Sequence, residues 1–501
     1  MPEARTWQLV AGSAVLGLAL AAGAVTAAGP WDSGQRKAER ARAALADARG
    51  GAHHAGRAAG PPPAAPRRPA PAPSAAGVLR ALGAPDGPAA AGRTGSTRTG
   101  DDLAPVLVPL LGDPGLGTLR TASVVDASTG KQLYGEGATT PMTPASTVKI
   151  ATTAAALSAL GPDHRIATTT VAAPDGRTVT LVGGGDPTLD RTRLKALADA
   201  TARALKARAG TAPAVRVTYD TSLYKGPLLH PIGPNDNLAP VTALMTDEGR
   251  TGGPATGPAP RTADPAGDTA TAFAGLLRQA GVRIEGDPAP GRAATGPKAA
   301  QLARTDSAPL ADLVERTLTS SDNDLAEALA RQTALARKQP ASFAGAGKAV
   351  HDELAKLGLP LAGARFADGS GLDRNDRVSA ALLTGLLTRA ADPARPALRP
   401  VLTGLPVSGF TGTLAGRFGT GPAASGAGLV RAKTGTLTGV NTLAGTVVTP
   451  DGRLLAFAFL AGRTDSAAAA QTALDRLSAA LAQTGAGTGL GTGAETGVAT
   501  R

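Results

Sequence analysis

Ser146 and Lys149 form a Ser-x-x-Lys motif at the start of an apolar stretch that predicts a helix over residues 145–160. Residues three apart share a helix face, so the Lys149 amine lies within reach of the Ser146 hydroxyl. A serine becomes a strong nucleophile when a neighbouring base takes its proton, and a desolvated lysine kept neutral by positive surroundings can be that base. The pair predicts acyl transfer through serine, although this spacing alone occurs by chance in most chains.

Two further polar motifs follow along the chain. Ser321-Asp322-Asn323 opens a predicted helix, and by itself it favours an N-cap, because Ser, Asp and Asn are the residues that cap helices. Lys433-Thr434-Gly435-Thr436 lies on a predicted strand. Its glycine lets a substrate backbone approach, and its Lys and Thr offer donors to a carboxylate, but in isolation the pattern favours a strand that ends in a polar turn.

The order of the three motifs favours chemistry over these simpler interpretations. Ser-x-x-Lys on a helix, Ser-Asp-Asn at a helix start and Lys-Thr-Gly on a strand are typical of class A β-lactamases and penicillin-binding proteins. A Ser-His-Asp triad is the main rival for a serine hydrolase, but the chain has no G-x-S-x-G motif.

Composition excludes several other classes of function. The 501 residues include no cysteine and five histidines, so disulfides, thiolate metal sites and a cysteine nucleophile are excluded and imidazole chemistry is not expected. Most of the net charge of +12 lies in residues 31–98, which carry eleven Lys or Arg against four acids. With only 2% aromatic residues to stack on bases, we expect no nucleic-acid partner.

The N-terminal fifth of the chain predicts export. Residues 1–29 contain a twenty-residue uncharged run, 9–28, which is typical of a signal peptide but also long enough for a membrane anchor. Residues 30–101 are rich in Ala, Pro, Gly and Arg, which predicts a disordered linker. The last stretch, 485–501, is of low complexity and is also expected to be disordered. We therefore expect an extracytoplasmic protein, secreted to the cell wall or tethered to the membrane through residues 9–28.

Between these ends the pattern predicts one folded region, 102–484. Its strands and helices alternate without a fixed repeat. A helical block is expected over 308–392, and three strands and a helix are expected after it, the last two strands being joined at Pro450-Asp451-Gly452-Arg453. From about 165 to 300, short strands and Gly/Pro turns are interrupted by helices near 191–208 and 268–281.

The sequence resembles the class C low-molecular-mass penicillin-binding proteins, the D-alanyl-D-alanine carboxypeptidase/endopeptidase family (peptidase family S13). Besides the three motifs, the resemblance rests on the stretches GGGDPT at 183–188 and DGSGL at 368–372. It implies an inserted, mainly β domain at about 165–300, consistent with the 175 residues between Ser146 and Ser321. The family usually has Ser-Arg where this chain has Asp373-Arg374, a loop difference that puts little in doubt.

The resemblance implies a role for each motif residue. Ser146 would attack the penultimate D-alanine carbonyl, with Lys149 as general base. Ser321 would relay a proton to the leaving D-alanine, and Asn323 would hold the peptide backbone of the substrate.

Lys433 would maintain an electropositive site on the strand. Thr434 and Thr436, on either side of Gly435, would bind the terminal carboxylate. The amides of Ser146 and Thr436 would form the oxyanion hole, and no metal or organic cofactor would take part.

We therefore predict an α+β transpeptidase-like fold, an antiparallel sheet flanked by helices with a helical lobe, and the activity of an exported serine D-Ala-D-Ala carboxypeptidase. Its partners would be peptidoglycan stem peptides, with β-lactams as inhibitors. A serine β-lactamase and a non-catalytic cell-wall-binding protein are the alternatives. Glu315 and Glu327 could be proposed as deacylating bases, but both have the helical spacing of solvated faces.

Overall fold

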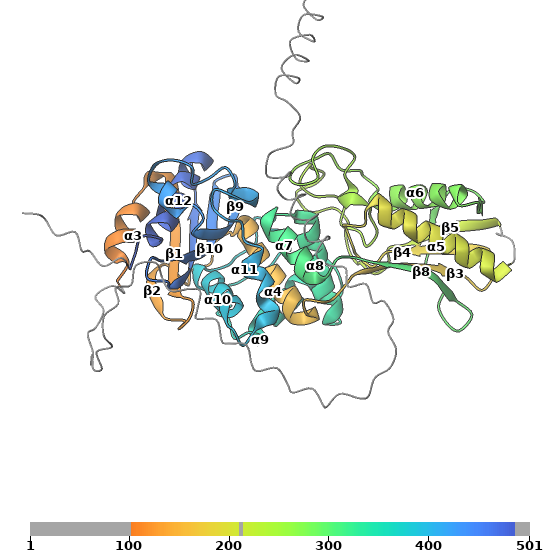
Figure 1. Cartoon of the computed structure of the whole chain (residues 1–501), viewed down its shortest axis with the longest axis horizontal. Coiled ribbons are helices and arrows are strands. Elements are labelled where there is room, and N and C mark those ends of the chain that lie inside the picture. Colours follow the sequence, from red (N-terminus) through yellow and green to blue (C-terminus); the bar gives the residue numbers. More distant parts are fainter. Residues whose placement is uncertain (1–101, 210–213, 486–501) are drawn as a thin grey trace, which may run out of the picture. The chain divides into compact units, whose positions relative to one another are not determined.

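A five-stranded antiparallel sheet joins the two ends of the folded region. The computed structural model describes residues 102–209 and 214–485, and the order of the strands in this sheet is β2-β1-β11-β10-β9 (Figure 1). The strands are β1 (Leu119–Asp126), β2 (Gln132–Glu136), β9 (Val430–Leu437), β10 (Val440–Val448) and β11 (Leu454–Gly462). Strands β1 and β11 are therefore neighbours although they lie at opposite ends of the region.

Both faces of this sheet are covered by helices, and β11 shows why its sequence is apolar throughout. Alternate side chains of a strand point to opposite faces. Phe457 and Phe459 pack with α3 (Ala104–Leu111) and α12 (Ala467–Leu481), whereas Ala458 and Leu460 belong to the core formed with α10 (Ala380–Ala391). The predicted strands and terminal helix of this part are confirmed.

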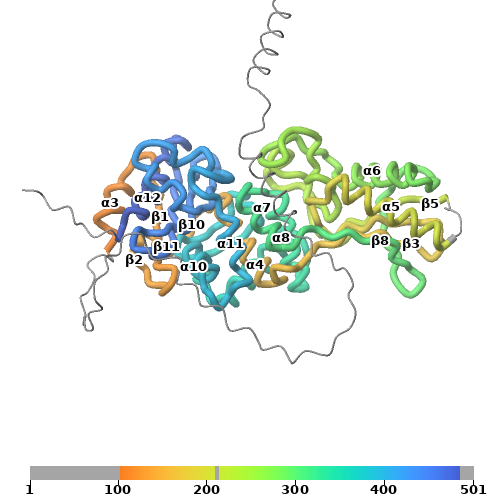
Figure 2. The backbone as a smooth tube through the Cα atoms, viewed as in Figure 1, coloured from red at the N-terminus to blue at the C-terminus, as the bar shows by residue number. Residues whose placement is uncertain are grey.

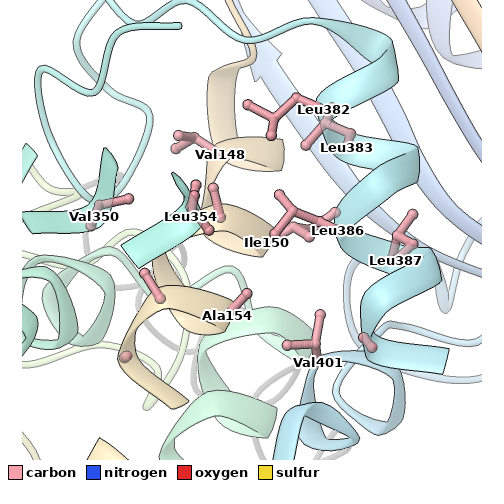
Figure 3. Packing of buried hydrophobic residues seen from close by; sticks show 14 of the residues in the cluster. Val148, Ile150, Ala154, Val350, Leu354, Leu382, Leu383, Leu386, Leu387 and Val401 are labelled. Atoms are coloured by element: carbon pink, nitrogen blue, oxygen red, sulfur yellow. The ribbon is translucent and has the colours of Figure 1, made fainter. Parts of the chain in front are cut away.

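The helical lobe surrounds α4 (Lys149–Leu160), the helix that follows the Ser-x-x-Lys motif. The other helices of the lobe are α7 (Leu310–Thr319), α8 (Asn323–Ala336), α9 (Phe343–Lys356) and α11 (Pro400–Thr403). Val148 and Ile150 lie between Leu354 of α9 and Leu382 and Leu386 of α10 (Figure 3). All five side chains are buried, so the start of α4 is anchored on several sides.

Between α4 and α7 the chain forms a second sheet, as Figure 2 traces. The strand order is β6-β5-β4-β3-β8, with β7 also paired to β5. The strands are β3 (Ala167–Ala172), β4 (Thr178–Val182), β5 (Ala214–Asp220), β6 (Arg283–Ile284), β7 (Ala289–Pro290) and β8 (Ala300–Asp306). Two helices, α5 (Arg191–Ala209) and α6 (Pro265–Gln279), pack on it through one buried cluster.

The stretch 183–188 is a tight turn at the root of this second sheet. The Gly185 amide donates to the Ala243 carbonyl (2.8 Å), and Gln332 of α8 donates to the Gly184 carbonyl (2.7 Å). A Cβ on Gly184 would overlap the carbonyl of Ala167. Close packing explains the glycines.

Within the described residues, no helix combines the length and the apolar character that crossing a membrane requires. The predicted signal or anchor at 1–29 and the predicted linker lie outside the described residues, as does nearly all of the predicted tail at 485–501.

We predict that Gly184→Ala destabilises the protein by about 1–3 kcal/mol, because the added methyl group overpacks backbone that cannot move freely. Thermal or urea unfolding of the purified protein measures this change. Gly252→Ala is the matched control, because a Cβ at Gly252 meets no atom within 4 Å. Equal stability of the two variants would contradict the interpretation.

Candidate active site

Ser146 and Lys149 lie on consecutive turns at the start of the lobe. Ser146 belongs to a short 3-10 helix, Ala145–Val148, which runs directly into α4. The Lys149 Nζ atom donates to the Ser146 Oγ atom at 3.0 Å. Ala145 has a φ of 48°, a left-handed conformation that costs about 1–3 kcal/mol for a residue with a side chain. The surrounding structure therefore holds this turn in place.

Two threonine hydroxyls hold that turn by donating to the carbonyl of Pro144. One is Thr147 in the turn itself (2.7 Å), and the other is Thr442 of β10 (2.8 Å). The turn that carries Ser146 is thus tied directly to the central sheet.

Lys149 makes two further hydrogen bonds inside the protein. Its Nζ atom donates to the Asn323 side-chain oxygen (2.7 Å) and to the Ser370 carbonyl (2.5 Å). Asn323 is the first residue of α8, and its side-chain Nδ2 atom donates to the backbone carbonyl of Asn237 (3.0 Å). These contacts fix which end of the Asn323 amide faces the lysine.

The Ser321-Asp322-Asn323 motif serves the helix and the site together. Asp322 is the N-cap of α8, where its carboxylate accepts from the Leu325 amide (3.0 Å). The N-cap interpretation is therefore confirmed for Asp322. Its neighbours Ser321 and Asn323 instead accept hydrogen bonds from Lys433 and Lys149. Ser321 has a φ of 57°, and its hydroxyl accepts from Lys433 Nζ at 2.9 Å.

Lys433 comes from β9 and brings the third motif into the same site. Besides Ser321, its Nζ atom donates to the Thr434 carbonyl (2.8 Å). The Thr434 hydroxyl donates to the hydroxyl of Thr413 (2.9 Å), a residue that no motif indicated. Thr436 is exposed two residues further along the strand.

Both lysines are fully buried, and burial changes their chemistry. Loss of hydration lowers the pKa of Lys149 to about 8, although the nearby carboxyl groups of Asp368, Asp322, Glu327 and Asp376 act in the opposite direction. Burial, followed by the charge of Lys149, holds the pKa of Lys433 well below its usual range. A large share of Lys149 is therefore neutral near pH 8 and available as a base.

Gly435 allows β9 to pass directly beside the turn that carries Ser146. A Cβ at this position would lie 2.7 Å from the Pro144 carbonyl oxygen and 3.1 Å from the Ser146 nitrogen, and it would also collide with Thr442. No side chain larger than a hydrogen atom fits, so the motif requires glycine here.

The motif residues open into a cavity of about 270 Å³. Its lining includes Ser146, Asn323, Thr434 and Thr436. The segment between α4 and α7, here called the inserted segment, contributes Asn237, Arg250, Gly257, Pro258 and Arg261. A neighbouring cavity of about 860 Å³ shares Arg250 and Ser320 with it but contains none of the eight predicted site residues. We therefore place the site in the smaller cavity.

Sequence reasoning was wrong about one residue and missed several. Glu327 is fully buried, not on a solvated face, and its carboxylate accepts from the amides of Gly369 and Ser370 (2.9 and 3.0 Å). The DGSGL stretch was noticed as a family feature, but nothing in it indicated that the Ser370 carbonyl would bind a lysine. Asn237 and Thr413 carry no sequence signal.

In the part of the chain that the structure describes, two groups of three side chains lie close enough to hold a metal ion. One is His230, Glu327 and Asp368, and the other is Glu248, Asp322 and Asp324. Their carboxylates are engaged by protein donors. In the first group these are backbone amides, His230 and Arg331, and in the second they are two further amides and three arginines. A metal would have to displace these donors, so the residues fit a hydrogen-bonded network better than a metal site.

Comparison with known families decides the identity. The family model for the D-Ala-D-Ala carboxypeptidase 3 (S13) family matches residues 106–260 and 253–483. The chain belongs to this family. It has the enzyme class of that family, a serine D-Ala-D-Ala carboxypeptidase, and the predicted family, function and fold class are confirmed.

Two curated relatives support the assignment. The chain is 38% identical to the carboxypeptidase DacB of Mycolicibacterium smegmatis, over 78% of this chain and 86% of the relative. It is 30% identical to the D-alanyl-D-alanine carboxypeptidase of an Actinomadura species, over 73% and 82% of the two chains.

The fold matches a solved member of the family. Penicillin-binding protein 4 (dacB) of Haemophilus influenzae superposes with a TM-score of 0.61 at 22% identity, covering 75% of this chain and 99% of the other. A second structure of that protein, complexed with a β-lactam, superposes with a TM-score of 0.60 at the same identity, over 74% and 98%.

We predict that Gly435→Ala lowers kcat for release of D-alanine from a D-Ala-D-Ala peptide by at least about tenfold, because displacement of a reacting group by a fraction of an ångström is costly. Release of D-alanine measures the rate, and a thermal melt shows whether the fold persists. Gly416→Ala is the control, since a Cβ there meets no atom within 4 Å. An unchanged kcat would show that β9 does not set the position of Ser146.

Proposed function

We propose that Ser146 is the nucleophile of this carboxypeptidase and Lys149 its general base. The observation that carries the proposal is the 3.0 Å contact between Ser146 Oγ and a fully buried Lys149 whose pKa is lowered to about 8. Neutral Lys149 takes the hydroxyl proton while Oγ attacks the carbonyl of the penultimate D-alanine. The peptide C–N bond then breaks and leaves an acyl-enzyme on Ser146.

The leaving amine needs a proton, and Ser321 and Lys433 are placed to supply one. Ser321 Oγ lies 2.9 Å from Lys433 Nζ. We infer that the Ser321 hydroxyl passes its proton to the departing D-alanine. It then recovers a proton from the two buried lysines, Lys149 and Lys433. Water then attacks the acyl-enzyme and gives a proton to Lys149. Lys149 returns that proton to Ser146 Oγ as the ester bond breaks and the shortened stem peptide leaves.

The substrate would lie along β9. Thr434 and Thr436 would bind its terminal carboxylate beside the Lys433 side chain, and Asn323 would hold its backbone amide. The backbone amides of Ser146 and Thr436 would donate to the oxyanion, an interaction worth about 2.7–4 kcal/mol per donor in comparable sites. Gly435 supports this arrangement, since it allows β9 to reach the turn that carries Ser146.

We extend the proposal to location and substrate. The natural substrates would be peptidoglycan stem peptides, including cross-linked ones cleaved as an endopeptidase, which places the site outside the cytoplasmic membrane. The uncharged run at residues 9–28 supports export. The β-lactam complex of the Haemophilus influenzae relative supports penicillin binding.

A fluorescent penicillin tests the nucleophile and the base. We expect the wild type to form a stable covalent adduct, Ser146→Ala to form none, and Lys149→Ala to react at least about a hundredfold more slowly, as expected when a general base is removed. Gel fluorescence over time measures the adduct. Ser158→Ala, on the distal part of α4, is the control.

Two outcomes of that assay would contradict the proposal. Labelling of Ser146→Ala at the wild-type rate would exclude Ser146 as nucleophile. Turnover of the wild-type adduct within seconds would favour a β-lactamase.

The pH dependence of acylation tests the state of Lys149. Protonated Lys149 cannot accept the Ser146 proton, so the rate should fall as the pH drops below about 8 and level off above it, following the lowered pKa of Lys149. Stopped-flow acylation between pH 6 and 10 measures this limb. Lys149→Arg should be inactive throughout, because arginine stays protonated. An acylation rate that falls only below about pH 10 would contradict the proposal that Lys149 is a desolvated base.

A further inference from the structure

A buried hydrogen-bond network adjoins Lys149. Its centre is the segment Asp368–Gly371, whose Ser370 carbonyl accepts the 2.5 Å hydrogen bond from Lys149 Nζ. A carbonyl is a fixed dipole and can position an amine only if its own peptide is held in place. The residues that hold this peptide therefore act on the lysine.

Two carboxylates hold the segment through hydrogen bonds. Glu327 of α8 accepts from the Gly369 and Ser370 amides (2.9 and 3.0 Å). Asp368 accepts from the Gly371 amide (2.6 Å) through one oxygen and from the Ser370 hydroxyl (3.1 Å) through the other. All of these groups are buried, so each hydrogen bond would be costly to lose.

His230, from the inserted segment, is a further member of this hydrogen-bond network. Its Nε2 atom lies 2.9 Å from the second oxygen of Asp368, and its Nδ1 atom accepts from the Ile232 amide (3.3 Å). An Nδ1 that accepts a hydrogen bond leaves the ring proton on Nε2, which then donates to Asp368. The ring also packs edge-on against Phe343, with centroids 5.4 Å apart, and is 4% exposed.

We propose that His230 is a positioning residue for the carboxypeptidase reaction, which acts through Asp368 to hold the Ser370 carbonyl against Lys149. The inference rests on the proposed role of Lys149 as base. His230 itself does not reach the substrate cavity lined by Ser146 and exchanges no proton with substrate. It makes the inserted segment part of the catalytic apparatus.

The charges around the network agree with this role. Burial and the neighbouring Asp368 carboxylate raise the pKa of Asp376 to about 10, so Asp376 stays protonated at neutral pH. Asp368 remains ionised, because its hydrogen bonds outweigh burial and hold its pKa below the usual range. The Nε2 proton of His230 is one of the donors that keep this buried anion in place.

The test replaces the histidine in two ways. His230→Phe keeps an aromatic ring beside Phe343 but removes the donor to Asp368, whereas His230→Gln can place an amide N–H close to the former Nε2 position. We expect His230→Phe to lower kcat for D-alanine release by about tenfold or more with little change in KM, and His230→Gln to restore kcat to within about threefold of the wild type. Thr170→Val, which removes a similarly buried hydrogen bond to Thr201 (2.8 Å) in the second sheet, should leave kcat unchanged.

A second variant covers the case in which His230→Phe does not fold. Ser370→Ala removes the hydroxyl bond to Asp368 without touching the inserted segment, and it should lower kcat several-fold at unchanged KM. Thermal melts accompany all variants. A wild-type kcat in folded His230→Phe, or equal losses in the Phe and Gln variants, overturns the proposal, as does a wild-type kcat in Ser370→Ala.

The same assays separate this inference from the proposed function. If Lys149→Ala abolishes acylation but folded His230→Phe reacts normally, only the positioning role fails. If Lys149→Ala reacts normally, the proposed base is wrong, and with it the basis for the network.

Discussion

The site depends on keeping two lysine side chains out of water within one small space. Burying an ammonium group costs several kcal/mol after relaxation, and a second positive charge beside it adds repulsion. Both costs are reduced when a lysine loses its proton, which is the form that a general base needs. The hydrogen bonds from Lys149 to Ser146, Asn323 and Ser370, and from Lys433 to Ser321, give the buried amines polar partners in place of water.

This constraint explains why so many elements meet at one point. Ser146 comes from the short 3-10 helix before α4, the Asn323 side-chain amide from α8, Lys433 from β9 and the Ser370 carbonyl from the loop before α10. The left-handed backbone of Ala145 and Ser321 is maintained by this packing. The inserted segment also contributes, through the Asn237 carbonyl and through His230. It is part of the site and not only an appendage to the fold.

Short-range patterns explain what could be predicted. The apolar run of β11 and the helical periods of α5, α6 and α12 depend on neighbouring residues, so their positions are visible in the sequence. The roles of Glu327 and His230 are not, because each depends on a partner more than forty residues away. A Glu at helical spacing has the same local pattern whether it faces solvent or a buried backbone amide, and only the tertiary structure distinguishes the two.

By itself, the sequence determined the chemistry. Without cysteine, and with its serine and lysine motifs in a fixed order, the chain is limited to serine acyl transfer, and its motifs identify the family. The tertiary structure alone decided the state of the catalytic groups. Burial lowers the pKa of Lys149, Gly435 permits close approach of β9, and Asp368, Glu327 and His230 hold the carbonyl beside the lysine. Desolvation and hydrogen-bond geometry are properties of surroundings in space, which the order of residues along a chain does not record.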